Sequence, residues 1–186
     1  MKRISLLLSI LLICFVAATQ AQTAPPKPGP ELQKLQVWLG HWKGVFEGQS
    51  GWWGPADKVP FEETSEMILG GFFVQTRVTW MNSGSHALFI QGYDPAKKSY
   101  PTIYYSGSDG KIRSGTLTAS AGNTWTLISD GPWHSYAGKD CLVRITTTFS
   151  ADSMSRQEKY EISEDGKTWT TIGEYKGTRV KPAAKK

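Results

Sequence analysis

The sequence predicts an all-β protein, an antiparallel up-and-down β-barrel of about ten strands with a short N-terminal helix, after a cleaved signal peptide. Three observations favour this fold. Apolar and polar residues alternate in segments that recur at intervals of about ten to fifteen residues. Turn-forming residues separate these segments. The 186 residues also include eight Trp, seven Tyr and seven Phe, which supply large rings for an interior. Closure into a barrel removes the open edges that short strands otherwise expose.

The first 21 residues have the pattern of a Sec-type signal peptide. Lys2 and Arg3 precede an apolar run over residues 4–17, and Thr19 and Ala21 place small residues at the cleavage site. The run is shorter than the roughly 20 residues that a membrane-spanning helix needs. We therefore expect a secreted or periplasmic protein with no transmembrane segment after cleavage.

The charge balance does not favour a nucleic-acid partner. The chain has 21 Lys and Arg against 16 Asp and Glu, but two of the positive charges belong to the predicted leader. Much of the remaining excess lies near the C-terminus, where residues 181–186 form a basic tail. Nucleic-acid-binding surfaces instead carry a basic stripe with interleaved aromatic residues. The sequence leaves the oligomeric state open.

Between the leader and the tail, we expect a Pro-rich lead-in over residues 22–29 and a single barrel domain over residues 30–180. Leu32, Leu35 and Trp38 recur at helical spacing before Gly40, which predicts a short amphipathic helix over residues 31–39. Strands are then expected over residues 42–48, 58–68, 72–81, 86–93, 99–106, 111–119, 123–129, 139–149, 153–162 and 167–179.

Alternation assigns the faces of these strands. In the third strand one face carries Phe72, Val74, Thr76, Val78 and Trp80. We expect this face to point inward. A barrel of about ten strands is wide enough to leave a cavity unless large side chains fill it. The sequence therefore does not determine how much of the interior is left unfilled.

Cys141 is the only cysteine outside the predicted leader, so no internal disulfide is expected. It shares one face of an alternating strand with Val143 and Ile145. This pattern predicts a small buried side chain. A reactive thiol or an intermolecular bridge is the less favoured alternative.

The order and spacing of several short motifs resemble a large bacterial family of domains of unknown function. The family has a lipocalin-like (calycin) barrel and is related to nitrobindins. The resemblance spans about residues 29–180. The motifs are Pro30-Glu31-Leu32 with Leu35, Leu39-Gly40-x-Trp42-x-Gly44, Gly70-Gly71-Phe72-Phe73, Gly92-Tyr93-Asp94-Pro95, the hairpin Ser163-Glu164-Asp165-Gly166-Lys167-Thr168-Trp169, and Tyr175-x-Gly177-Thr178-Arg179.

The Gly-x-Trp element has a structural role in such barrels. Gly40 lets the chain turn from the helix into the first strand, and Trp42 is large enough to plug one end of the barrel. In lipocalins, an Arg of the last strand covers such a Trp, and the matching residue here is Arg179. We assign Gly40, Trp42 and Arg179 to the barrel floor.

The resemblance to nitrobindins also implies a haem site with a proximal His on a late strand. This chain departs from that pattern, because residues 135–186 contain no His. Its histidines are His41, His86 and His134. Haem binding through His134 or through a Tyr ligand is kept as an alternative, and no cofactor is otherwise predicted.

The sequence does not indicate a catalytic site. It has no G-x-S-x-G motif and no H-E-x-x-H motif. Glu62 and Glu63 are neighbours in a strand, so their side chains point to opposite faces and cannot form an acid–base pair. A solvated strand face or barrel rim is the favoured interpretation for both, and one Glu that points inward, where burial would raise its pKa, is the alternative. An enzyme is therefore not favoured, and neither a catalytic residue nor a metal site is predicted.

The favoured function is non-catalytic binding of a small, largely apolar molecule inside the barrel. Arg113 or Arg144 would anchor an anionic group if it pointed inward, although alternation places Arg144 outward. Trp52 and Trp53 lie in a Gly-rich loop and are candidates for a lid or a contact patch. An interaction module that uses the barrel rim is the remaining alternative. The side chains predicted to line the ligand site are Trp80, Phe89, Tyr104, Trp125 and Val143.

Overall fold

The computed structural model describes residues 27–49, 57–120, 122–136 and 139–181. The predicted signal peptide, most of the lead-in and tail, and the Trp52–Trp53 loop lie outside these residues. The elements are α2 (Pro30–Lys34), the 3-10 turns η1 (Leu35–Trp38) and η2 (Leu69–Gly71), and strands β1 (Gly40–Gly48), β2 (Asp57–Ile68), β3 (Phe73–Trp80), β4 (His86–Gln91), β5 (Tyr100–Ser106), β6 (Ile112–Ala119), β7 (Thr124–Ser129), β8 (His134–Tyr136), β9 (Lys139–Phe149), β10 (Ser155–Ser163) and β11 (Thr170–Arg179).

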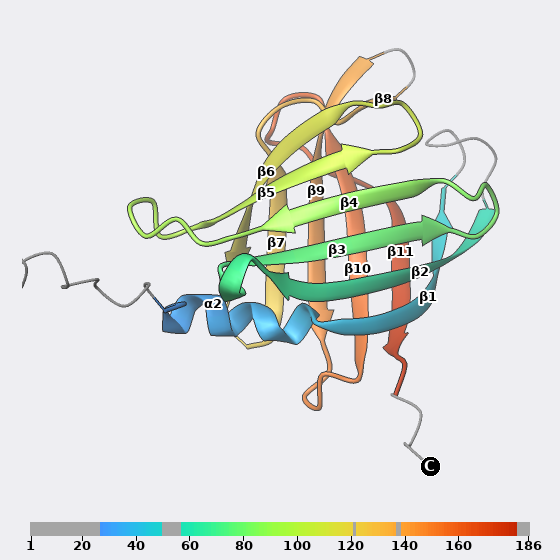
Figure 1. The fold of residues 1–186 in the computed structure, drawn as a ribbon. Helices are drawn as coiled ribbons and strands as arrows, with labels where there is room; N and C mark the ends of the chain where they lie inside the picture. The colour runs from blue at the N-terminus through green and yellow to red at the C-terminus, as the bar shows by residue number, and fades with distance from the viewer. Residues whose placement is uncertain (1–26, 50–56, 121, 137–138, 182–186) are drawn as a thin grey trace, which may run out of the picture.

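Ten of these strands form a closed antiparallel barrel (Figure 1). Strands β1 to β7 pair in chain order, and β9 continues the sheet from β7. The ring closes because β10 pairs with both β9 and β11, and β11 pairs with β1 from Trp42–Arg179 to Gly48–Gly173. This topology confirms the predicted up-and-down barrel.

Strand β8 is an addition that the sequence pattern did not predict. It pairs with the first three residues of β9, beyond the part of β9 that pairs with β7. Three residues are too few to display an alternating pattern, and Gly131 and Pro132 just before them favour a loop. The strand was therefore missed.

Helix α2 and η1 lie across one end of the barrel (Figure 1). Pro30 starts the helix at a position where its missing N–H costs nothing, and Leu32 and Leu35 are buried. The Tyr100 hydroxyl on β5 lies 2.9 Å from Oε2 of Glu31, which ties the helix to the barrel. The single helix predicted over residues 31–39 is thus an α-helical turn that tightens into a 3-10 turn before Gly40.

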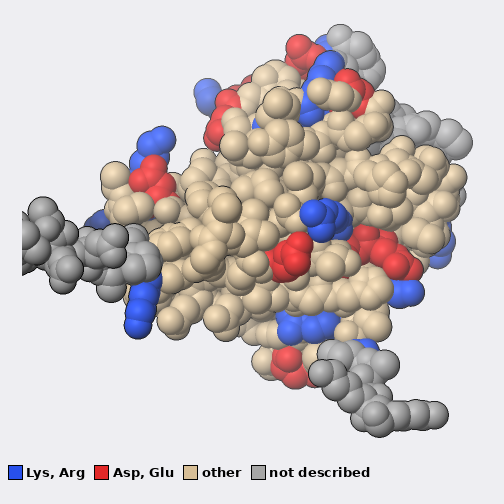
Figure 2. All heavy atoms as spheres, viewed as in Figure 1, with Lys and Arg blue, Asp and Glu red and all other residues tan. Residues whose placement is uncertain are grey.

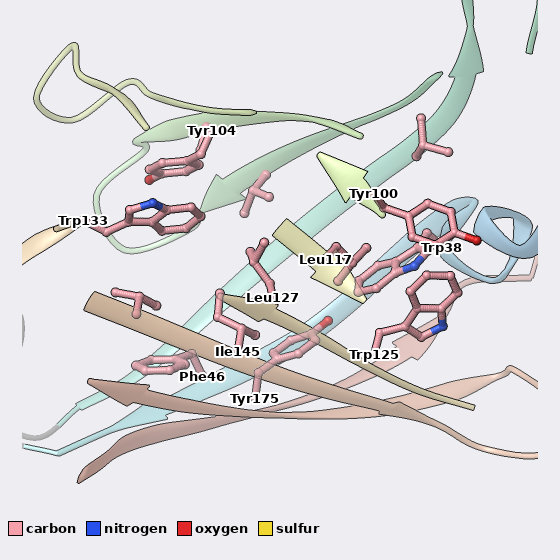
Figure 3. Packing of buried hydrophobic residues seen from close by; sticks show 14 of the residues in the cluster. Trp38, Phe46, Tyr100, Tyr104, Leu117, Trp125, Leu127, Trp133, Ile145 and Tyr175 are labelled. Atoms are coloured by element: carbon pink, nitrogen blue, oxygen red, sulfur yellow. The ribbon is translucent and has the colours of Figure 1, made fainter. Parts of the chain in front are cut away.

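The core is a continuous cluster of buried apolar side chains with aromatic groups toward both ends (Figure 3). Near the helix, the Trp125 ring meets Trp38 edge-on at 6.2 Å and Tyr100 at 5.2 Å. Away from the helix, Tyr104 and Trp133 stack at 5.3 Å. Aliphatic side chains lie between the two groups, among them Leu117, Leu127 and Ile145.

Two glycines make room for the largest ring of the last strand. Tyr175 is fully buried and stacks on Phe61 at 4.2 Å. Gly44 and Gly177 lie directly opposite one another in β1 and β11. A Cβ atom at either position would clash with the Tyr175 ring, so both residues need to lack a side chain.

The outer surface carries ion pairs between neighbouring strands. Lys43 Nζ lies 2.8 Å from Oε1 of Glu62, and Arg77 Nη1 lies 3.3 Å from Oε1 of Glu66. On the face shown in Figure 2, acidic and basic groups lie in small mixed clusters on a mostly uncharged surface. No helix within the described part of the chain is long and apolar enough to cross a membrane.

Candidate ligand-binding cavity

The barrel encloses a cavity of about 100 Å³ between its aromatic ends. Its wall is mainly apolar, and its polar groups come chiefly from β2, β3, β4, β9 and β10. The lining residues are Trp38, Phe46, Phe61, Glu63, Thr76, Val78, Trp80, Phe89, Gln91, Tyr104, Leu117, Leu127, Trp133, Val143, Ile145, Thr147, Arg156, Glu158 and Tyr160.

The floor of the barrel is built around Trp42, which is fully buried. Its indole Nε1 donates to the carbonyl oxygen of Trp38 at 3.0 Å. The Arg179 guanidinium lies 4.7 Å from the Trp42 ring centre and donates to the carbonyl oxygen of Val37 at 2.7 Å. Gly40 has a φ of +109°, which an L side chain rarely adopts, and it turns the chain into β1 beside Arg179. The three residues assigned to the floor therefore meet there.

A second guanidinium, that of Arg156, reaches Trp42 from β10. Its Cζ lies 4.8 Å from the Trp42 ring centre and 5.1 Å from that of Tyr175. Only 1% of the Arg156 side chain is exposed. A guanidinium at this depth needs charged partners, because an isolated buried charge is very costly.

Two buried carboxylates provide those partners. Arg156 Nη2 donates to Oε2 of Glu63, and Arg156 Nε lies 3.0 Å from Oε1 of Glu158. The Tyr160 hydroxyl donates to the other oxygen of Glu158 at 2.8 Å. Both carboxylate side chains are less than 8% exposed. We call Glu63, Arg156, Glu158 and Tyr160 the interior charge cluster.

The environment of the cluster shifts several of its pKa values. Burial raises the pKa of Glu63, and the negative charge of Glu158 adds to this effect, although Arg156 opposes it. Burial also raises the pKa of Tyr160, which the charge and hydrogen bond of Glu158 reinforce. Burial alone would lower the pKa of Arg156, but Glu63 and Glu158 outweigh it and raise that pKa. Glu63 thus holds a proton more readily than a solvent-exposed Glu.

Other polar groups at the cavity differ in how well they are satisfied. The hydroxyls of Thr76 and Ser65 bind each other at 2.7 Å. Among the described residues, neither Oε1 of Gln91 nor Nη1 of Arg156 has a hydrogen-bond partner, and both residues are more than nine-tenths buried. Both line the cavity, so they are available to a molecule inside it.

Four of the five predicted lining residues border this cavity: Trp80, Phe89, Tyr104 and Val143. Trp125 does not. It is buried, but it packs against Trp38 and Tyr100 close to the helix. The alternation of β7 correctly turned its side chain inward, but alternation does not give the height of a residue along the barrel axis.

Neither of the two arginines considered as anchors serves the interior. Arg144 lies on the outer face, where its Nε donates to Oε2 of Glu161 at 2.7 Å and its guanidinium covers Trp169. Arg113 is mostly buried near the barrel end, where its Nε donates to the carbonyl oxygen of Trp133 and its other nitrogens bind Asp109. Both guanidinium groups are therefore engaged by protein groups.

The cavity residues that the sequence pattern did not indicate include Arg156, Glu158 and Tyr160. They alternate along β10 and so share one face, but Ser155, Gln157 and Lys159 on the other face are equally polar. A strand with two polar faces gives no indication of which one is buried. For Glu62 and Glu63 the sequence favoured solvated positions, and a single inward-pointing Glu was only the alternative. The structure places Glu63 in the interior.

A family model described as "Protein of unknown function (DUF1579)" matches residues 27–179. The chain belongs to this family. No curated protein is significantly similar to the DUF1579 chain. A solved structure from Nostoc punctiforme, described as a protein with unknown function from the DUF3598 family, is 10% identical, with a TM-score of 0.24. The match covers 82% of this chain and 100% of that one.

The described residues of this DUF1579 barrel do not fit a haem. His41 lies on the outer face, 3.2 Å from Oε2 of Glu62, and His86 lies on the outer face beside Thr79. The side chain of His134 is outside the described part. Tyr104 and Tyr160 border the cavity, but about 100 Å³ is far below the roughly 300–1,000 Å³ of pockets for drug-sized ligands, and a haem is larger still.

Two further kinds of reactive site were considered, a cysteine nucleophile and a metal centre. Cys141 is a free thiol, 1% exposed, as its alternation predicted. Within the described ranges, no three His, Cys, Asp or Glu side chains gather as a metal-binding group. The interior charge cluster is therefore the polar arrangement most relevant to a ligand.

Proposed function

We propose that this DUF1579 protein is exported and binds a small, largely apolar molecule inside its barrel, without catalysing a reaction on it. The observation that carries this proposal is the cavity itself. It combines an apolar wall with one group of buried polar side chains, which is the usual composition of a small-molecule site.

The size of the cavity limits the ligand. An engineered cavity of roughly 150 Å³ in another protein holds benzene. A volume of about 100 Å³ therefore suits a ligand of only a few non-hydrogen atoms. Phe61, Trp80, Phe89, Leu127 and Ile145 offer apolar contacts to such a ligand.

A binding role without catalysis is supported by the state of the buried carboxylates. Glu63 and Glu158 both pair with Arg156, and Glu158 also accepts a hydrogen bond from Tyr160. Proton transfer by either carboxylate would disturb these pairs. Their arrangement favours fixed recognition of a polar group over repeated acid–base cycles.

The proposal is tested by a substitution on β7 that fills the cavity with a larger side chain. Leu127 lines the cavity and is 5% exposed, whereas its neighbour Ile128 points outward and is 41% exposed. We expect benzene or butan-1-ol to raise the melting temperature of the wild type and of Ile128→Phe, but not of Leu127→Phe. A ligand that binds only the native state stabilises it by mass action.

Two results would contradict the proposal. A shift that persists in Leu127→Phe would place binding outside the cavity. The absence of any shift in the wild type, together with the absence of a bound small molecule in native mass spectra of protein from its own periplasm or medium, would show that the interior is simply a core.

A further inference from the structure

The interior charge cluster contains one positive charge for two carboxylates. Arg156 lies on β10 and pairs with Glu63 of β2 and with Glu158 of β10. No other cationic group of the described residues borders the cavity. With both carboxylates ionised, the cluster therefore carries a net charge of −1. A buried net charge is costly, so the site favours a further positive charge.

We propose that the cavity binds a small primary amine, whose ammonium group lies at the interior charge cluster and whose short alkyl chain lies against the aromatic wall. This inference rests on the proposed function, because it names the chemical class of the ligand for the same cavity. It goes further by excluding carboxylic acids, which are the ligands that a buried arginine would first suggest.

The contacts of Arg156 argue against an anionic ligand. Its Nη2 and Nε already face carboxylates, and its guanidinium lies within 5.1 Å of the ring centres of Trp42 and Tyr175. Nη1 has no partner among the described residues and could donate to a ligand, but the charge around it is already negative. An added carboxylate would bring a third negative charge to a single guanidinium in a site whose charged side chains are almost fully buried. Such like-charge crowding is unfavourable.

The acceptors around the cavity fit an ammonium group. An ammonium group has three N–H donors and no acceptor. The carboxylates of Glu63 and Glu158 supply charged acceptors, and Oε1 of Gln91 is a buried acceptor with no partner among the described residues. Charge-assisted hydrogen bonds of this kind are stronger than those between neutral groups.

In the absence of a ligand, a proton on Glu63 would supply the missing positive charge, and burial, which raises the pKa of Glu63, favours that proton. Ammonium binding then displaces that proton to solvent, and the net charge of the site stays the same. The charged and titratable groups around Glu63 are Arg156, Glu158, Tyr160 and Tyr175. Tyr160 and Tyr175 have raised pKa values because they are buried, so they stay neutral near neutral pH.

The test compares three probes of nearly equal size: butylamine, butan-1-ol and butyrate. Isothermal titration of the purified wild-type protein near neutral pH should give an affinity for butylamine about tenfold or more above that for the other two, since hydrogen bonds to charged groups are the stronger ones. Butylamine affinity should also rise as the pH rises toward the pKa of the amine, because fewer protons then compete at Glu63.

Glu63→Gln and Glu62→Gln form a matched pair of variants. The two residues are neighbours on β2, both carry ion-paired carboxylates, and both substitutions change the net charge equally. We expect Glu63→Gln to lose the preference for butylamine over butan-1-ol, and Glu62→Gln to keep it. If Glu63→Gln does not fold, Glu158→Gln replaces it, and the wild-type probe series stands without either variant.

Equal affinity for the amine and the alcohol, tighter binding of butyrate, or an amine preference that survives in folded Glu63→Gln would each overturn the amine proposal. In all three cases the cavity still binds a ligand, so the proposed function stands. If none of the probes binds and the Leu127→Phe experiment also shows no cavity binding, the proposed function fails and the amine proposal fails with it.

Discussion

Trp42 shows how much of the barrel floor depends on one side chain. Its ring is fully buried, contacts the guanidinium groups of Arg156 and Arg179, and meets Phe149 edge-on at 5.8 Å. Its indole nitrogen also holds the carbonyl oxygen of Trp38 at the end of η1. The residue therefore joins η1, the first strand and three later strands, β9, β10 and β11.

We expect Trp42→Ala to lower the free energy of unfolding by about 3–5 kcal/mol, the range for loss of a large buried aromatic side chain. Denaturant unfolding at equilibrium measures this change. Phe73→Ala is the control, because Phe73 lies on the outer face and is 37% exposed. An unchanged unfolding midpoint for Trp42→Ala would show that Trp42 does not stabilise the barrel floor.

Glu63 should make stability fall as the pH rises. Its folded-state pKa is raised by burial, so the native state holds a proton that the unfolded state has lost. The stabilisation from this proton is complete below the unfolded pKa of Glu63 and disappears as the pH rises through its folded pKa.

Glu63→Gln cannot titrate at this position, so the variant should lack this part of the pH dependence. Urea unfolding at a series of pH values compares the slopes. Glu62→Gln is the control with the opposite sign: the pKa of Glu62 is lowered, chiefly by its hydrogen bond to Lys43, and its stabilisation is lost as the pH falls. Parallel curves for wild type and Glu63→Gln would contradict the prediction.

Among the elements, β1 and β11 are adapted to each other by their glycines. The Tyr175 ring lies where side chains of Gly44 and Gly177 would otherwise project. The Phe46 ring likewise lies over Gly173, where a Cβ atom would clash with that ring. These strands therefore pack two large rings close to the backbone of the neighbouring strand.

Gly177→Ala should consequently destabilise the protein by about 1–3 kcal/mol, as for other overpacked sites. Near-UV circular dichroism should change as well, because the Tyr175 ring has to move. Gly131→Ala is the control, since a Cβ at Gly131 meets nothing within 4 Å and the residue has no positive φ. Equal stability of the two variants would mean that the ring adjusts without cost.

The success of sequence reasoning varied from strand to strand. In β3 and β9, apolar residues are concentrated on one face, and Val74, Val78, Cys141 and Val143 are all buried as expected. In β10 both faces are polar, so the sequence predicted the strand but did not indicate which of its faces is buried. The burial of Arg156 depends on Glu63, which is 93 positions away, and short-range patterns carry no such information.

At the scale of the whole molecule, the core is a single cluster that includes residues from Leu32 to Tyr175. The ten barrel strands share this core and complete one another's hydrogen bonding. The sequence predicted the aromatic content of such a core, but the volume left inside depends on how the rings pack after closure. That is why the size of the cavity could not be predicted from the sequence.

Because the core is shared, we expect a single cooperative unfolding transition. Far-UV circular dichroism and Trp fluorescence should give coincident denaturation curves, as in other single domains of this size. Circular dichroism follows all strands, whereas fluorescence is weighted toward indoles such as Trp38, Trp42 and Trp125 near the helix end. Separate transitions would show that the two ends of the barrel unfold independently.

The seam between β1 and β11 also governs when the chain is able to fold. It joins the first barrel strand to the last, and the hydrogen bond from Arg179 to Val37 spans 142 positions. During synthesis, β1 has no partner on this side until nearly the whole domain has been made. The ring is completed only by the final strand, and contacts this distant in sequence are formed slowly. Late closure therefore leaves the barrel open along this seam until synthesis of β11 is complete.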